Sequence, residues 1–251
     1  MRNFILSTVT ALILMMAYVA FADDPLQRHL KAKVTEVWTP VPEVVTPGDN
    51  SAPPSDAEIL FDGSSLDQWR SLNGSNAGWT INDDGSVTVK PGSGDILTRE
   101  NYGDVQLHVE WRTPADIKSE SQGRGNSGVF LMQHYEVQVL DSFNNDTYPN
   151  GQAGSVYKQH IPLVNASRKP GAWQTYDIIF TAPRFSKNGR LNSPARVTVL
   201  HNGVLIQNNV TLAGHTAYVG APQYNAHGEL PIKLQDHSNL VSYRNIWVRR
   251  L

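Results

Sequence analysis

The chain has 251 residues, of which 40% are hydrophobic and 18% charged, and its 21 basic and 23 acidic residues give a formal net charge of −2 at pH 7. This composition is typical of a globular protein with a sizeable core, and the lack of a basic tract excludes a nucleic acid as an expected partner. There is no cysteine, so disulfides, thiolate catalysis and a lipid-bearing cysteine are excluded.

The first 22 residues have the pattern of a secretory signal. Arg2 precedes a mostly apolar run over residues 4–19, and Ala20-Phe21-Ala22 is a cleavage site of the small-x-small type. The apolar run is at the lower limit for spanning a bilayer, which disfavours the alternative of a retained membrane anchor. We therefore expect an exported protein, released into the periplasm or the extracellular space by cleavage near Ala22, without stable membrane insertion.

Residues 23–57 are rich in proline and polar side chains, so a long helix is not expected there. We predict an extended arm over this segment. Trp38, Val41, Val44 and Val45 supply more apolar surface than flexible linkers usually carry, which favours an arm packed across the domain over a disordered linker. Both alternatives stay open.

From Leu60 onward, short segments alternate apolar and polar residues and are separated by turn residues. Asn202-Gly203 lies between two apolar runs and predicts a tight hairpin, because both residues tolerate the positive φ angles of such a turn. No segment has a sustained helical period. Residues 58–251 are therefore expected to form one all-β domain, a sandwich of two antiparallel sheets with their apolar faces together. The expected strands include residues 105–112, 135–139, 176–180, 195–200, 231–237 and 243–249.

The first candidate site is Glu136-x-Gln138-x-x-Asp141. Two carboxyl groups and an amide near one strand can protonate a leaving oxygen and activate a nucleophile. Glu136 and Gln138 share the polar face of the strand. Asp141 falls on the opposite face unless a bulge intervenes, so it is equally well explained as the residue that ends the strand. Glutamate has a weak β propensity, which favours a functional reason for Glu136.

Polar residues on two other strands and in one glycine-rich loop are the remaining candidates. Glu110 and Arg112 share a face of one strand, where a solvated ion pair is the ordinary explanation. Gln235 and His237 point the same way near the end of another strand, and histidine exchanges protons readily near neutral pH. Arg124 lies in a glycine-rich segment, whose backbone allows close approach to a ligand, and is a candidate for holding an oxyanion.

Several long motifs resemble those of the 3-keto-disaccharide hydrolase family: LFDGSSLDQW, GNSGVFL, YEVQVLDS, GQAGSVYKQ, ARVTVLHNGVLIQ and LQDHSNLVSYRNIWVR. The resemblance runs in order over residues 54–251. It implies the concanavalin A-like jelly-roll fold, in agreement with the strand pattern, and an exported bacterial enzyme that acts on sugars. The implied substrates are glycosides and disaccharides whose C3 hydroxyl has been oxidised to a ketone.

A C3 ketone acidifies the hydrogen on C2, so a base can remove it, the group on C1 is expelled, and water then adds back. In such a reaction Glu136 and His237 are the expected catalytic pair, one as base and the other as acid, in an order that the sequence leaves open. An arginine, either Arg112 or Arg124, would stabilise the enolate oxygen, and the two glutamines would orient the sugar. The candidates for binding the substrate are Gln138, Gln235, Glu110, Arg112, Arg124 and Asp141.

Two other functions stay open. The fold is also a lectin fold, so a non-catalytic carbohydrate-binding module is the first alternative. A conventional β-glycanase is the second, because laminarinase-like enzymes of this fold carry the strand motif E-x-D-x-x-E. Here Gln138 and the shorter Asp141 replace the last two acids, which disfavours a two-carboxylate double displacement. The sequence requires no cofactor. A divalent metal such as calcium is compatible with the oxygen-rich segment 141–150, whose spacing matches no EF-hand loop, and the oligomeric state is not indicated.

Overall fold

The computed structural model describes residues 24–49 and 51–251. They form two units, one ending at Val44 and the other spanning Val45–Leu251. The secretory signal expected over residues 1–22 lies outside the described residues and stays a prediction. In the part of the chain that is described, no helix is both long and apolar enough to cross a membrane.

The first unit contains one helix, α2 (Pro25–Lys33), within the described residues. Its amino-terminal end is capped by Asp24, whose carboxylate accepts a hydrogen bond from the backbone N–H of Leu26 at 3.1 Å, and a proline fits the first turn. Over residues 25–33 the prediction of an extended arm is therefore wrong. The helix buries no residue, so the sequence shows no apolar period that would have indicated it. The packing predicted for Trp38, Val41 and Val44 stays a prediction.

The second unit is built from β-strands and two short 3-10 helices. The strands are β1 (Glu58–Phe61), β2 (Trp69–Ser71), β3 (Thr80–Ile81), β4 (Val87–Thr88), β5 (Ile96–Thr98), β6 (Val105–Arg112), β7 (Ser127–Leu131), β8 (Tyr135–Val139), β9 (Gln174–Thr181), β10 (Arg184–Phe185), β11 (Leu191–Ser193), β12 (Arg196–His201), β13 (Val204–Thr211), β14 (Lys233–Leu234) and β15 (Ser242–Arg250). The 3-10 helices are η1 (Ser121–Gly123) and η2 (Pro149–Gly151).

In the described residues these strands form two main sheets and the β10-β11 pair. The eight-stranded sheet has the order β13-β12-β9-β6-β15-β4-β3, with β1 added beside β15, and the five-stranded sheet has the order β2-β5-β14-β7-β8. The strand pairs are antiparallel. The sheets bury their apolar faces in one core, which confirms the predicted jelly-roll sandwich of two antiparallel sheets.

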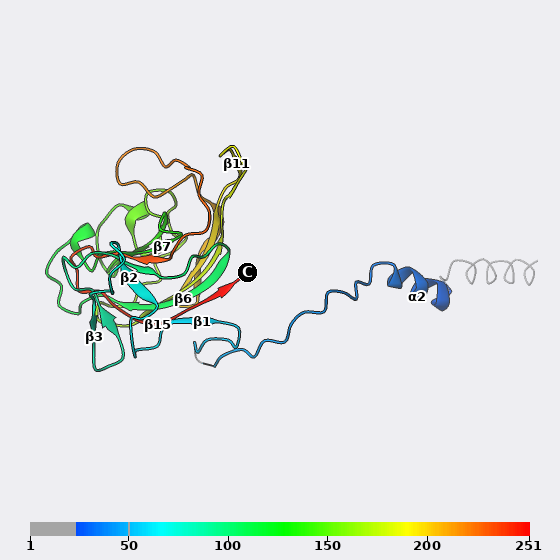
Figure 1. The fold of residues 1–251 in the computed structure, drawn as a ribbon, viewed down its shortest axis with the longest axis horizontal. Coiled ribbons are helices and arrows are strands. Elements are labelled where there is room, and N and C mark those ends of the chain that lie inside the picture. Colours follow the sequence, from blue (N-terminus) through cyan, green and yellow to red (C-terminus); the bar gives the residue numbers. More distant parts are fainter. Residues whose placement is uncertain (1–23, 50) are drawn as a thin grey trace, which may run out of the picture. The chain divides into compact units, whose positions relative to one another are not determined.

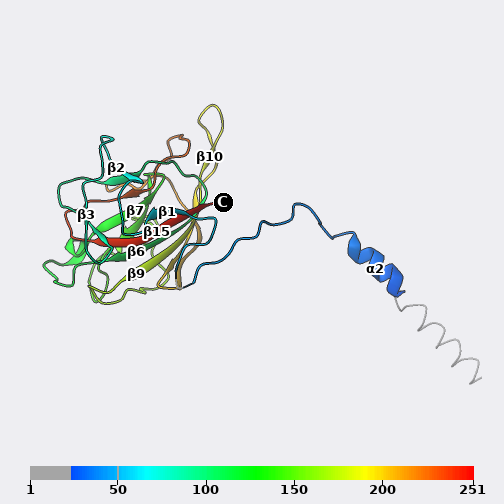
Figure 2. The ribbon, with the colours of Figure 1, turned by 60° about the horizontal axis from the view of Figure 1, so that its bottom comes forward.

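The first and the last strand of the second unit pair with each other in the larger sheet. β15, the last strand, runs between β6 and β4 and also pairs with β1, the first strand (Figures 1 and 2). In this register Arg244 lies opposite Glu110, and Trp247 lies opposite His108. The pairing therefore brings polar side chains from distant parts of the sequence together on the outer face of this sheet.

Residues that follow Val45 belong to the second unit and pack on this outer face. The backbone carbonyl of Ser51 accepts hydrogen bonds from Nδ2 of Asn245 at 2.9 Å and from Nε1 of Trp247 at 3.2 Å. Asp56 forms an ion pair with Arg249 at 2.6 Å. The carboxy-terminal part of the proline-rich segment is thus held on the sandwich.

Two predicted local features decide where polar groups point. Alternation along β8 buries Tyr135, Val137 and Val139 in the core, as predicted, so the residues between them face away from it. Asn202-Gly203 forms the turn between β12 and β13, with φ angles of 52° and 78°. This confirms the predicted hairpin, since both residues adopt the left-handed conformation that the turn needs.

Candidate active site

Glu136 and Gln138 form the floor of a cavity of about 260 Å³ on the outer face of the five-stranded sheet. Gln235 and His237, which follow β14, line the same cavity. The structure thus brings together four of the residues predicted from the sequence, including both members of the expected catalytic pair. The other lining residues are Asn126, Phe130, Tyr157, Thr216 and Tyr218.

The register of three strands assembles this cavity. β7 lies between β8 and β14, with Phe130 opposite both Glu136 and Lys233. The backbone N–H of Gln235 donates to the carbonyl of Gly128 at 3.1 Å, and this hydrogen bond holds Gln235 beside β7. A Cβ atom on Gly128 would lie 2.6 Å from Oε1 of Glu136, so glycine at this position leaves the room that the carboxyl group occupies.

Glu136 is a buried carboxyl group, with 5% of its surface exposed. Burial raises its pKa to about 8, because a charged carboxylate is poorly solvated there. With its side-chain nitrogen turned toward this carboxyl group, Gln138 donates to Oε1 of Glu136 at 2.9 Å and to the carbonyl of Ser127 at 3.0 Å. The carboxyl group therefore holds its proton at neutral pH, which suits a general acid.

Lys233 is the cation whose charge acts on the pKa of Glu136. Its positive charge lowers the carboxyl pKa, but less than burial raises it, and Asp95 acts in the same direction as burial. The ammonium of Lys233 lies 3.1 Å from Oδ2 of Asp95 and 3.8 Å from the centroid of the Phe130 ring. Because its charge is already balanced by Asp95, Lys233 does not force Glu136 to ionise.

His237 is exposed at the cavity, and within the described part of the chain its imidazole has no hydrogen-bond partner. Its backbone is held instead: the carbonyl of His237 accepts from Nδ2 of Asn239 at 2.8 Å. The neighbouring Asp236 points away, accepting the backbone N–H groups of Gly94 and Ser238. A solvent-accessible imidazole on a fixed backbone is suited to taking a proton from a bound molecule.

Arg124 and Asp141 lie in a different place. They form an ion pair, with Nε of Arg124 3.0 Å from Oδ2 of Asp141, and they line a separate cavity of about 320 Å³. The Arg124 guanidinium also donates to the carbonyls of Phe143 and Asn144. β8 ends at Val139, so strand alternation no longer sets the direction of Asp141. The structure does not bring these two residues to the Glu136 cavity, and the guanidinium already has acceptors there.

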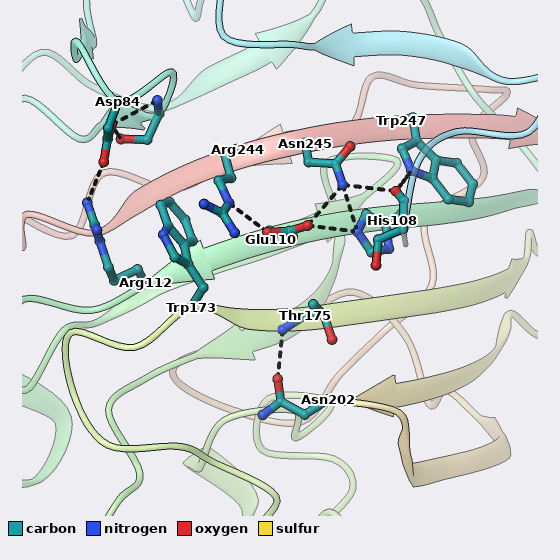
Figure 3. Close-up of polar contacts among 12 residues, drawn as sticks. Asp84, His108, Glu110, Arg112, Trp173, Thr175, Asn202, Arg244, Asn245 and Trp247 are labelled. Carbon is teal, nitrogen blue, oxygen red and sulfur yellow. Dashed lines mark hydrogen bonds and ion pairs between the residues drawn. The ribbon is translucent and has the colours of Figure 1, made fainter. Parts of the chain in front are cut away.

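Glu110 and Arg112 lie on β6, in the eight-stranded sheet (Figure 3). Glu110 accepts from Nε of Arg244 at 2.7 Å and from Nδ2 of Asn245 at 2.9 Å. Burial raises the Glu110 pKa, but the hydrogen bonds that it receives outweigh this and lower it to about 2. Arg112 pairs with Asp84 at 3.2 Å. Neither Glu110 nor Arg112 lines the Glu136 cavity, so the structure separates them from the other candidates.

This outer-face cluster also holds an aromatic side chain. The guanidinium groups of Arg112 and Arg244 lie 4.5 Å and 4.2 Å from the centroid of the Trp173 ring (Figure 3). The ion pairs and the cation–π contacts explain this cluster as a packed polar surface of the sheet. The sequence did not indicate Arg244 or Asn245, because their contacts depend on the pairing of β15 with β6.

Five residues that line the cavity were not among the predicted site residues: Asn126, Phe130, Tyr157, Thr216 and Tyr218. Lys233, whose charge acts on Glu136, lies on β14 two residues before the predicted Gln235 and does not line the cavity. Tyr157 lies in the segment GQAGSVYKQ, which carried the family resemblance but supplied no candidate site residue. Thr216 and Tyr218 lie between β13 and β14 in a segment without a strand pattern, and no signal in the sequence indicated them. In residues 24–49 and 51–251, no group of three or more His, Cys, Asp or Glu side chains is placed to hold a metal ion.

Three histidines fasten the segment that carries Thr216 and Tyr218 to the β7-β8 turn. The rings of His134 and His215 stack with centroids 3.9 Å apart, and His227 lies 5.1 Å from His134 and 5.4 Å from His215. The N–H of Thr216 donates to the carbonyl of His134 at 2.7 Å, and the hydroxyl of Thr216 accepts from the N–H of Glu136 at 3.0 Å. This segment therefore forms one wall of the cavity.

With Gln in place of His134, the protein is expected to lose less stability when the pH is lowered from 7 to 5. Burial, followed by the charges of His215 and His227, lowers the pKa of His134 to about 4, compared with about 6.5 in an unfolded chain. Between these two values the unfolded state binds more protons, so stability falls as the pH is lowered through this window. Urea unfolding at pH 7 and pH 5 should show a smaller drop for His134→Gln than for the wild type. His29→Gln, on the exposed helix α2, should keep the wild-type drop, and equal drops in all three proteins would contradict the prediction.

Comparison with known proteins assigns a family. A model of the 3-keto-alpha-glucoside-1,2-lyase-like domain matches residues 56–249. The chain belongs to this family. It is 50% identical to a putative glycosyl hydrolase from Parabacteroides distasonis ATCC 8503, whose crystal structure superposes with a TM-score of 0.84 over 87% of this chain and 96% of that chain. A second putative glycosyl hydrolase from the same organism is 20% identical and shares the fold, with a TM-score of 0.56 over 78% of this chain and 94% of that chain. No curated protein matched the sequence.

Membership of the 3-keto-alpha-glucoside-1,2-lyase-like family confirms the resemblance carried by the sequence motifs. By family, the chain is a carbohydrate-active hydrolase or lyase. The family match covers β1 through most of β15, and it contains all the residues that line the Glu136 cavity. The helix α2 lies outside the matched residues.

Proposed function

We propose that the protein cleaves glycosides and disaccharides whose C3 carbon is a ketone. One observation carries the proposal. In a chain of this family, a buried carboxyl group that keeps its proton at neutral pH shares a small cavity with an unpaired imidazole. An acid and a base on one bound sugar are what a proton abstraction followed by loss of a leaving group requires.

The proposed reaction begins with the ketone, which makes the hydrogen on C2 acidic. His237 takes this proton, and the electron pair moves into the enolate. The enolate then reforms the ketone and makes a double bond between C1 and C2, while the bond from C1 to the leaving oxygen breaks. Glu136 gives its proton to that oxygen, so the leaving group departs as a neutral alcohol.

Water then completes a hydrolysis. The ionised Glu136 takes a proton from water, the oxygen of that water bonds to C1, and the protonated His237 returns its proton to C2. Both side chains regain their starting states. The net change is the replacement of the leaving group on C1 by a hydroxyl group.

The amide side chains of the cavity complete the proposal. Gln138 donates to the Glu136 carboxyl and fixes its direction. The amide of Gln235 has no partner among the described residues, so its N–H group can donate to the enolate oxygen. The sequence offered Arg112 or Arg124 for this task, but neither lines the cavity, and the proposal does not use them.

The placement of the acids disfavours a conventional β-glycanase. Retaining hydrolysis needs two carboxyl groups about 5–5.5 Å apart across the scissile bond. Asp141 lines another cavity and is paired with Arg124, so Glu136 has no second carboxyl group from that motif. A ketone that acidifies the substrate removes the need for a second carboxyl group.

An assay on paired substrates tests the proposal. We expect release of the leaving group from a 3-keto-disaccharide and no release from the same disaccharide with an unoxidised C3, with and without a chelator present. Cleavage of both substrates would favour a glycanase. Binding of either sugar without cleavage would favour a carbohydrate-binding module, and each of these results would overturn the proposal.

A further inference from the structure

The Glu136 cavity has an aromatic side to which the proposed reaction gives no role. Phe130, Tyr157 and Tyr218 line the cavity together with the polar residues. The ring of Phe130 is covered by Lys233 at 3.8 Å, but Tyr218 is 75% exposed. Tyr218 therefore presents an aromatic ring at the edge of the cavity, where a bound ligand can contact it.

Lys158 holds Tyr218 in place. Its ammonium donates to the backbone carbonyl of Tyr218 at 2.8 Å and lies 4.3 Å from the centroid of the Tyr218 ring. The same ammonium lies 5.7 Å from the ring of Tyr157 and 5.8 Å from the ring of Tyr148. One cation therefore joins two segments that are distant in the sequence, the one around Tyr157 and the one around Tyr218.

The segment around Tyr157 is itself fixed. The hydroxyl groups of Tyr148 and Tyr157 form a hydrogen bond of 2.7 Å. Lys158 has a φ angle of 58°, a left-handed conformation that a non-glycine residue adopts at a cost, and its N–H donates to the carbonyl of Asn150 at 2.8 Å. The contacts around Lys158 thus maintain a strained backbone that directs its side chain toward Tyr218.

The size of the cavity indicates where the second part of a disaccharide must lie. About 260 Å³ is less than the ~300–1,000 Å³ of pockets that enclose drug-sized ligands. One sugar ring over Glu136 and His237 uses this space. The ring on the leaving side then has to lie at the mouth of the cavity, where Tyr218 is exposed.

We propose that Tyr218, Tyr157 and Lys158 form the leaving-group subsite of this enzyme, and that it takes a second sugar ring. The inference rests on the proposed function. The apolar face of a sugar stacks on the rigid ring of Tyr218, which loses little conformational entropy on binding. An ammonium has three N–H donors, and the carbonyl of Tyr218 uses one of them, so Lys158 offers the others to sugar oxygens. The subsite selects disaccharides over glycosides with small leaving groups.

The test compares two 3-keto substrates that differ only in the leaving group, a 3-keto-disaccharide and the methyl glycoside of the same 3-keto sugar. For Tyr218→Ala, we expect kcat/KM for the disaccharide to fall about tenfold further than kcat/KM for the methyl glycoside, mostly through KM. Tyr218→Phe keeps the ring and should recover most of the disaccharide value. Val219→Ala, next to it and 83% exposed, is the matched control and should behave as the wild type.

The outcomes separate the two proposals. If the wild type cleaves both 3-keto substrates and Tyr218→Ala loses the same factor on both, or loses nothing on either, the leaving-group subsite is wrong while the proposed function stands. If the wild type cleaves neither substrate, both proposals fall. Thermal unfolding of each variant shows whether a loss of activity comes from loss of the fold.

Discussion

Replacing Glu136 by Gln is expected to lower kcat on a 3-keto-disaccharide by about 10²- to 10⁴-fold, the usual contribution of a general acid or base. The amide has the shape of the carboxyl group but carries no acidic proton for the leaving oxygen. The fold should be retained, because the buried Glu136 is already uncharged at neutral pH. Steady-state kinetics with a check of thermal unfolding measures both effects. Glu100→Gln, the same change at an exposed position, is the control.

The pH profile distinguishes the acid from the base. With Glu136 as the acid, kcat/KM falls as the pH rises through about 8, because the carboxyl group then loses the proton that the reaction needs. With Glu136 as the base, activity would instead rise through the same pH. A profile without a change near this pH, or a Glu136→Gln variant with nearly wild-type kcat, would rule out a catalytic role for Glu136.

Replacing Arg124 by Met is expected to destabilise the protein by about 3–5 kcal/mol, the usual effect of removing one partner from a buried ion pair. Asp141, with 5% of its surface exposed, would lose the cation that pairs with it. The carbonyls of Phe143 and Asn144 would lose their donor as well. Urea unfolding measures the change. Arg190→Met, at an exposed position, should change stability by less than about 0.5 kcal/mol.

The same variant tests the role that the sequence suggested for Arg124. If the guanidinium holds the substrate, Arg124→Met would raise KM for the 3-keto-disaccharide while leaving the unfolding free energy close to that of the wild type. If it stabilises the segment after β8, stability falls and KM of the folded fraction stays near the wild-type value. The ion pair with Asp141 leads us to expect the second result.

Local patterns in the sequence located the longer strands and part of the site, but not the length of β14, which spans only Lys233–Leu234 of the predicted residues 231–237. The two-residue period along β8 put Glu136 and Gln138 on one face, and the period near β14 put Gln235 and His237 on another. Side chains of a strand alternate between its faces whatever the rest of the chain does, so these pairs needed no tertiary information. The turn at Asn202-Gly203 was equally local, because it depends only on the φ angles that those residues tolerate.

The tertiary structure decided which of these faces meet. Antiparallel pairing of β7 with both β8 and β14 joined the Glu136 face to the His237 face, and the same kind of pairing put Glu110 and Arg112 in the other sheet. Pairing register and burial depend on contacts between residues far apart in the chain, which no local pattern encodes. Burial is also what gives Glu136 a pKa near 8. The sequence by itself therefore determined the candidate acid and base, and only the assembled sheets decided that they share a cavity and that the acid keeps its proton.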